Sequence, residues 1–201
     1  MRILELVIDE NQEDESGVDY IALVDAPAIQ SNWMAFNEQK KVELKFKIQD
    51  EEKRIVSGYF MIADLPIARM DDEGKMFYVV FRKDTIEKIV NKFMRNGFNA
   101  NINLMHDSNA IANGVYVIES LIIDTERGIK APEGFEKVPN GSWWGSMRVE
   151  NDEIWEQVLN GEFRGFSVEG MFSQDKDFEL PEKVINKIKE VIKKYKANKG
   201  N

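Results

Sequence analysis

His106 is the only histidine in this 201-residue chain. Imidazole takes up and releases protons near neutral pH more readily than any other unperturbed side chain, so His106 is the first candidate for a general base. The chain contains no cysteine, which excludes disulfides, thiolate nucleophiles and cysteine-ligated metals. A single histidine also excludes a zinc site built from several imidazoles. Acid–base or nucleophilic chemistry around His106 therefore remains open.

Ser167 is the hydroxyl whose sequence context most favours a nucleophile. It stands between Gly165 and Gly170 in an otherwise apolar β run, where packing gives a hydroxyl no obvious purpose. A serine hydrolase needs such a hydroxyl, a base that takes its proton and usually a third group that orients the base. The flanking glycines let other backbone approach closely and leave amide groups to face an oxyanion. For Ser167 the alternative to a nucleophile is a hydroxyl that is hydrogen-bonded to a neighbouring strand. For His106 the alternative to a base is a structural histidine.

The composition is that of a globular protein, with 43% hydrophobic and 31% charged residues. The net charge of −9 argues against nucleic acid or an anionic membrane as the main partner, because both require clustered cations. The first residues lack the pattern of a signal peptide, and no apolar run approaches the roughly 18 residues of a membrane span. We therefore expect a soluble protein in a reducing compartment.

Alternating and apolar runs predict about eight strands that mostly follow one another along the chain. The expected strands include residues 2–9, 42–48, 54–63, 76–81, 115–123, 142–149 and 165–172. Helices are expected at 84–96, 152–161 and from Pro181 to about residue 195, and residues 127–141 form a loop long enough to be a lid. Consecutive strands with few helices predict an α+β fold, an antiparallel sheet or barrel with helices outside it.

Several of these segments together resemble a known family. They are Met-His-Asp-Ser at 105–108, the strand 115–123, Gly-Ser-Trp-Trp-Gly-Ser-Met-Arg-Val at 141–149, Asp-Glu-Ile-Trp at 152–155 and Gly-Glu-Phe-Arg-Gly-Phe-Ser-Val-Glu-Gly at 161–170. In this order they resemble the serine proteases of tailed phages, the XkdF-like branch of the prohead maturation proteases. The segment 20–28 is also similar to that branch, so the resemblance covers roughly residues 18–172.

The resemblance implies a mostly antiparallel β-barrel surrounded by helices, similar to the herpesvirus assemblins. It also implies a serine endopeptidase that cuts segments of the scaffold and the major capsid protein, and itself, inside the assembling prohead in the host cytoplasm. By position, His106 is the base and Ser167 the nucleophile, with no cofactor and no metal. Herpesvirus relatives suggest a homodimer or higher oligomer, without nucleic-acid or membrane partners. We expect residues 1–180 to form the protease domain and 181–201 a C-terminal helix and tail, a possible linker to a scaffold segment.

The third member of the site is open, because herpesvirus enzymes use a second histidine that this chain lacks. Glu119 is the first choice, since it stands in mid-strand among apolar neighbours, where a carboxylate without a partner is costly. A glutamate on the wet face of a strand is the competing interpretation. Asp107 and Glu169 are rivals, although Asp107 would more naturally cap the following loop. Glu169 would share a strand face with Ser167. A dyad without any third residue also remains possible.

Two other functions are compatible with the residues. The first is a non-catalytic module that binds scaffold or capsid protein with the same fold. The second, metal-dependent hydrolysis at His106, Asp107 and Asp124, is weaker because one histidine and scattered carboxylates make a poor transition-metal site. The pair Trp143–Trp144 could place one ring in a substrate groove, since successive strand residues face opposite sides, but two core positions are the simpler interpretation.

Overall fold

The computed structural model describes residues 3–9, 11, 17–25, 45–70, 73–74, 76–136 and 138–175. The expected helix from Pro181 onward lies outside these residues, as do the first residues of the expected strands 2–9 and 42–48. The fold and the site are those of this described part of the chain.

Strands are the main regular structure of the described residues. In order they are β1 (Ile3–Val7), β2 (Tyr20–Val24), β3 (Lys47–Asp50), β4 (Ile55–Met61), β5 (Ile67–Met70), β6 (Met76–Phe81), β7 (Ile102–Leu104), β8 (Asp107–Ile111), β9 (Val115–Ile122), β10 (Trp143–Val149), β11 (Gly165–Glu169) and β12 (Ser173–Asp175). The helices are α2 (Lys83–Arg95), the 3-10 turn η1 (Phe98–Ala100) and α3 (Asp152–Leu159). The prediction of a mostly β protein is confirmed.

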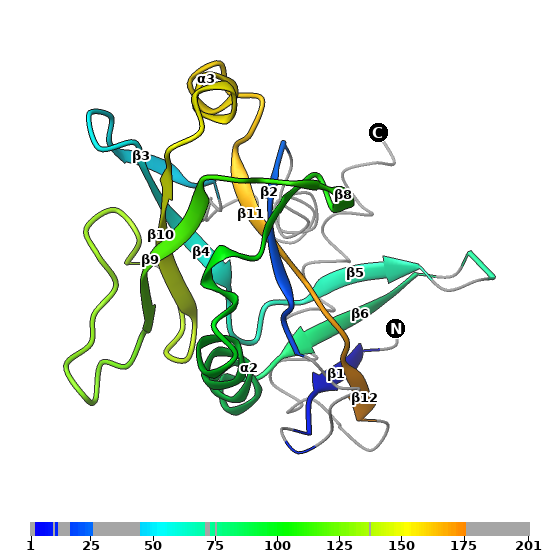
Figure 1. Cartoon of the computed structure of the whole chain (residues 1–201). Coiled ribbons are helices and arrows are strands. Elements are labelled where there is room, and N and C mark those ends of the chain that lie inside the picture. Colours follow the sequence, from blue (N-terminus) through cyan, green and yellow to red (C-terminus); the bar gives the residue numbers. More distant parts are fainter. Residues whose placement is uncertain are drawn as a thin grey trace, which may run out of the picture.

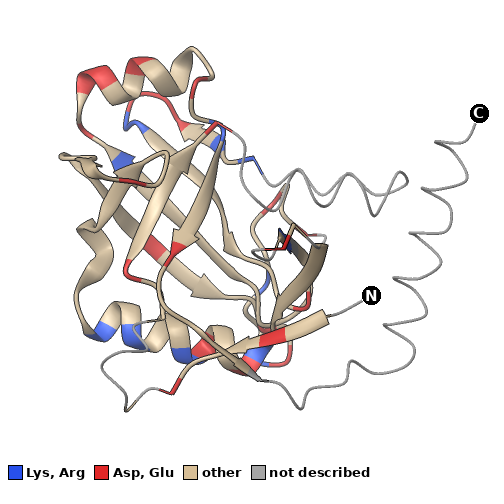
Figure 2. Ribbon diagram, turned by 90° about the vertical axis from the view of Figure 1, so that its right-hand side faces the viewer, with Lys and Arg blue, Asp and Glu red and all other residues tan. Residues whose placement is uncertain are grey.

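These strands form three four-stranded sheets, in the orders β12-β1-β6-β5, β3-β4-β10-β9 and β11-β2-β7-β8. Neighbouring strands are antiparallel except for the pairs β1–β6 and β2–β7. The two α-helices lie at opposite ends of the sheet assembly, as Figures 1 and 2 both show. Figure 2 also shows acidic residues in red on α3 and basic residues in blue on α2. The third sheet carries Ser167 and Glu169 on β11, and the turn between its strands β7 and β8 carries His106.

Aromatic side chains join the sheets into one core. Phe166 of β11 packs against Phe46 and Phe60, at centroid distances of 5.2 and 4.9 Å. Phe60 in turn meets Trp143 of β10, which also contacts Phe93 of α2. Because Phe60 and Phe166 are almost completely buried, the strand that carries Ser167 is fixed firmly to the middle sheet.

The pair Trp143–Trp144 is buried on both faces of β10. Trp143 enters the main core, and Trp144 enters a second cluster against Phe135 of the long loop. Tyr59 belongs to that cluster and donates a hydrogen bond to the Phe135 carbonyl, and burial raises the pKa of its phenol. Both tryptophans therefore support the core. The expected loop at 127–141 is anchored by Phe135, which speaks against its use as a freely moving lid.

Candidate active site

Three neighbouring strands place Ser167, Ala22 and Asn103 in one row across the third sheet. Ser167 of β11 is opposite Ala22 of β2, and Ala22 is opposite Asn103 of β7. Residues opposite each other on neighbouring strands point to the same face, and residues two apart on a strand also share a face. Ser167, Asn103 and Glu169 therefore lie on the same side of the sheet. Ala22, which lies between Ser167 and Asn103, is fully buried.

His106 occupies the two-residue turn between β7 and β8. Leu104 and Asp107 face each other across this turn, and both Met105 and His106 have positive φ angles, 54° and 62°. Such turns normally use asparagine and glycine, because a positive φ is unfavourable for residues with larger side chains. A strained backbone at two consecutive non-glycine residues is a feature often found at functional sites. The turn carries the imidazole beyond the end of β7.

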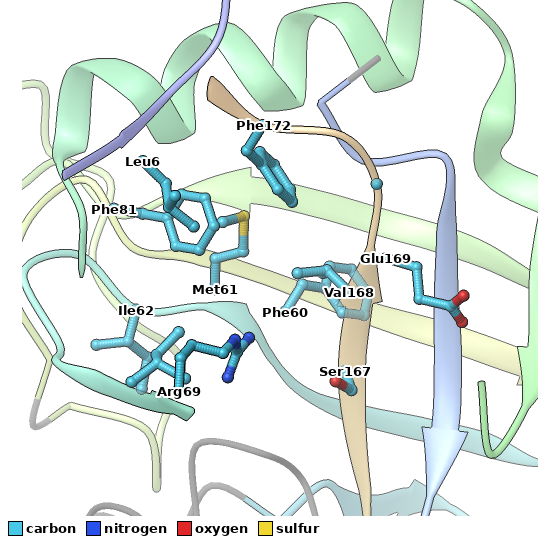
Figure 3. A pocket seen from close by; sticks show the side chains of 12 residues that line it. Leu6, Phe60, Met61, Ile62, Arg69, Phe81, Ser167, Val168, Glu169 and Phe172 are labelled. Atoms are coloured by element: carbon cyan, nitrogen blue, oxygen red, sulfur yellow. The ribbon is translucent and has the colours of Figure 1, made fainter. Parts of the chain in front are cut away.

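The carboxylate that meets His106 is that of Glu169. The Nδ1 atom of His106 lies 2.8 Å from Glu169 Oε1, and the same oxygen accepts a hydrogen bond of 2.6 Å from Nδ2 of Asn103. Figure 3 shows the Glu169 side chain leaving β11 and extending across β2, which is the direction of these two partners. One carboxylate oxygen thus ties the β7–β8 turn to β11.

This contact fixes the tautomer of a neutral His106. A carboxylate can only accept a hydrogen bond, so Nδ1 must carry the proton that it donates to Glu169. The remaining ring nitrogen, Nε2, then has a free lone pair and can take a proton from another group. The His106 side chain is 39% exposed, which leaves its ring accessible. A carboxylate on Nδ1 and a lone pair on Nε2 are what a histidine base requires.

Ser167 is 9% exposed and lines a pocket of about 410 Å³. Within the described residues no hydrogen bond joins its hydroxyl to His106, so the structure shows both residues on one face of the sheet but not in direct contact. Hydrogen bonds between catalytic groups are often loose without substrate and tighten when it binds. Figure 3 shows Ser167 on β11 with the guanidinium of Arg69 directed into the same pocket. Burial lowers the pKa of Arg69, whose guanidinium nonetheless stays charged at neutral pH.

Gly170, which follows Ser167 on the chain, is explained by packing. A Cβ atom on Gly170 would lie 1.5 Å from the carbonyl oxygen of Gly17, so only glycine fits there. The amide of Gly17 also donates a hydrogen bond to the Met171 carbonyl. The close backbone approach expected from the sequence is therefore present, and it attaches the end of β11 to the segment before β2.

Glu119 stands in a different sheet, on β9. Its Oε2 atom accepts a 2.5 Å hydrogen bond from Ser146 of β10, whose hydroxyl lies 2.7 Å from that of Ser57 on β4. Ser146 has one proton and gives it to Glu119, so Ser57 must donate to Ser146. Glu119 itself is exposed, as in the competing interpretation of a glutamate on a wet strand face. The structure does not bring it to His106.

The remaining sequence candidates have local roles. Asp107 accepts two hydrogen bonds from Asn109, the capping role foreseen for it. Asp124 accepts bonds from the amides of Glu126 and Arg127 in the turn after β9. Among the residues that the structure describes, no three histidine or acidic side chains gather in a way that could hold a metal ion.

Asn103 is the residue of this cluster that the sequence interpretation missed. It is 1% exposed, and its Oδ1 atom has no hydrogen-bond partner in the described part of the chain. The available signal was an amide side chain between two apolar residues, Ile102 and Leu104. It also stands three positions before the only histidine. Without the register of β2 and β7, that signal cannot be connected to Glu169.

Comparison with known protein families assigns the chain to one of them. The family model described as "Putative phage serine protease XkdF" matches residues 41–176 of the chain. These include β3 to β11, the β7–β8 turn and both candidate residues, His106 and Ser167. The chain belongs to this family of phage proteins.

Among curated proteins, the chain is similar to the phage-like element PBSX protein XkdF of Bacillus subtilis (strain 168). The two are 26% identical over 159 residues, which cover 76% of this chain and 52% of the relative. The chain thus spans about half the length of that relative. No solved structure gives a significant match. No helix in the described residues is long and apolar enough to cross a membrane.

Proposed function

We propose that this chain is a serine endopeptidase in which Ser167 is the nucleophile, His106 the general base and Glu169 the carboxylate that orients the base. Nε2 of His106 takes the Ser167 proton as Oγ attacks the scissile carbonyl, and the imidazolium returns that proton to the leaving amine. Water then hydrolyses the acyl-enzyme, with the same nitrogen as base. Glu169 takes the place considered above for Glu119.

The observation that carries the proposal is the 2.8 Å contact between His106 Nδ1 and Glu169 Oε1, on the sheet face that also bears Ser167. It supplies the tautomer that a base for Ser167 needs, and Asn103 holds the carboxylate in place. The strained turn at Met105 and His106 supports the same conclusion. A small movement of the β7–β8 turn would bring Nε2 to the Ser167 hydroxyl while Nδ1 keeps its contact with Glu169.

The biological part of the proposal is supported by the phage family and by the mostly antiparallel strands. We take the fold to be a relative of the herpesvirus protease barrel, with residues 1–180 as the protease domain and 181–201 as a C-terminal extension. The substrates are segments of the scaffold and the major capsid protein, and of the chain itself. Cleavage takes place in the assembling prohead, in the host cytoplasm, by a homodimer or higher oligomer that needs no cofactor.

A serine-directed phosphonate tests the chemistry without knowledge of the natural substrate. The Ser167 oxygen attacks phosphorus, a phenoxide leaves, and the increase in mass is located by peptide mapping. We expect wild-type protein to be labelled at Ser167 and the His106→Gln variant to react at least about 10²-fold more slowly. Asp107→Asn is the matched control, because this neighbour of His106 only closes a local turn, and it should react like wild type.

Labelling that ignores His106, or that falls on other serines, would contradict the proposed roles. If no labelling occurs in a protein that is shown to be folded, the chain is instead a non-catalytic module that binds scaffold or capsid protein.

A further inference from the structure

The pocket beside Ser167 has mostly apolar walls. It lies between β11 and the strands β1, β4, β5 and β6, and Figure 3 shows its lining side chains. Phe60, Met61 and Phe81 form a buried part of the wall, whereas Leu6, Val168 and Phe172 are only half-buried. Its volume of about 410 Å³ is within the range of binding sites for small ligands.

The half-buried side chains are the ones that gain from a ligand. Phe172 is held in place by an edge contact with Phe81, at a centroid distance of 4.9 Å, and keeps part of its surface open. An apolar group that covers Leu6, Val168 and Phe172 would remove apolar surface from water on both partners. A hydrated or charged group would forgo that gain.

The position of β11 indicates how a peptide would lie. Among the described strands β11 ends its sheet, with β2 as its partner on one side. Beyond the bridge between Gly165 and Lys45, the other edge of β11 borders the pocket. Four successive residues from Ser167 to Gly170 line the pocket, as expected when a strand edge forms one wall. Extended peptides commonly bind to such edges as an added strand.

We propose that this pocket is the specificity subsite of the protease, which binds a large apolar side chain of an extended peptide next to the scissile bond. The inference rests on the proposed function, since it assigns the substrate class of the same site. The peptide lies along β11, its carbonyl beside the Ser167 hydroxyl and its leucine- or phenylalanine-like side chain against Leu6, Val168 and Phe172.

Arg69 supplies the main competing interpretation. Among the described residues that line the pocket it is the only cation, and its guanidinium is directed into the pocket in Figure 3. A pocket built for an acidic side chain would use this charge. The apolar walls outweigh it in area, so we expect Arg69 to cover the pocket with its aliphatic stem rather than to select the substrate.

The test uses a series of diphenyl phosphonates that differ only in the side chain next to phosphorus: leucine, phenylalanine, glycine, glutamate and lysine analogues. The rate of Ser167 labelling of the full chain is measured for each. Leucine and phenylalanine probes should react at least about tenfold faster than the glycine probe, because a well-matched apolar pocket discriminates by about that factor. Glutamate and lysine probes should react no faster than glycine.

Two pocket variants sharpen the result. Leu6→Trp should slow the leucine and phenylalanine probes by about tenfold and leave the glycine probe unchanged, because the indole fills the pocket. If Leu6→Trp does not fold, Phe172→Ala takes its place as the test. It adds no bulk and should reduce the preference for the leucine and phenylalanine probes. Leu121→Trp is the matched control, since Leu121 packs against the second cluster away from the pocket, and it should keep the wild-type preference.

The outcomes separate the inference from the proposed function. Equal rates for all probes, or a glutamate preference that Arg69→Gln abolishes, overturn the apolar subsite while the serine protease stands. If no probe labels Ser167 in folded protein, the proposed function fails and the subsite fails with it.

Discussion

Two carboxylates in this protein each end a chain of polar residues that crosses neighbouring strands. In the middle sheet, Ser57 donates to Ser146, which donates to Glu119. In the third sheet, Glu169 binds His106, and Ser167 lies on the same face. The two arrangements differ in the middle residue, which is a hydroxyl in one and an imidazole in the other. A hydroxyl passes on a hydrogen bond, but only the imidazole accepts a proton near neutral pH.

The serines of the two arrangements also differ in their surroundings. Ser57 and Ser146 are fully buried, and their hydroxyls already have partners. Ser167 lines an open pocket, and no hydrogen bond of its hydroxyl is present among the described residues. A buried chain of satisfied hydrogen bonds stabilises the sheet, whereas a hydroxyl that faces a pocket can react once an oriented base reaches it. The comparison shows that a serine and a carboxylate alone do not define a catalytic site.

Replacing a serine of each arrangement in turn should give the largest difference between the two. Ser167→Ala should lower peptide cleavage by about 10³-fold or more, because the nucleophile is lost. Ser57→Ala should keep cleavage within about twofold when measured well below its unfolding temperature. Cleavage of a fluorogenic peptide by both variants checks this. Full activity of Ser167→Ala would remove Ser167 from the mechanism.

Removing the residue that holds the orienting carboxylate should have a smaller effect. Asn103→Ala deletes the 2.6 Å hydrogen bond to Glu169 Oε1 and should slow phosphonate labelling of Ser167 by about 10- to 100-fold, as for other groups that position a catalytic residue. A role in positioning predicts an altered pH profile of the rate as well. An unchanged rate and profile in Asn103→Ala would show that Asn103 is only structural.

The smallest expected effect concerns stability. Here the serine of the middle sheet, and not Ser167, should be the more sensitive one. Ser146→Ala breaks the buried chain at its centre and leaves the Ser57 hydroxyl without an acceptor, so it should cost about 1–3 kcal/mol of unfolding free energy. Ser167→Ala should cost less than about 0.5 kcal/mol, because it breaks no hydrogen bond of the described structure. Urea unfolding of both variants measures the difference. Equal losses would contradict the division into a structural and a reactive chain.

Sequence patterns predicted the strands that alternate or are strongly apolar, such as β4, β9, β10 and β11. They missed β5, β8 and β12. β8 is a polar, exposed strand, and its connecting turn at Met105–His106 has neither the glycine nor the asparagine that marks a hairpin. β12 has only three residues and is held by pairing with β1, which lies far away in the sequence. Such strands owe their form to tertiary partners.

The candidate site was predictable to a similar extent. His106 and Ser167 could be named because the first is unique and the second stands out in an apolar strand. The choice between Glu119 and Glu169 depended on which sheet each strand joins, and spacing along the chain does not contain that information. Glu119 is only a short distance from His106 in sequence, yet β9 pairs with β10, whereas Glu169 reaches His106 across β2.

The most direct test of the account is the rate of Ser167 labelling by a phosphonate in Glu169→Gln and Glu119→Gln, measured side by side. An amide in place of the Glu169 carboxylate can hold the imidazole in the wrong tautomer, so Glu169→Gln should react up to about 10⁴-fold more slowly than wild type. Glu119→Gln should react within about twofold of wild type. A large loss in Glu119→Gln with little change in Glu169→Gln would contradict the central claim that Glu169 orients His106.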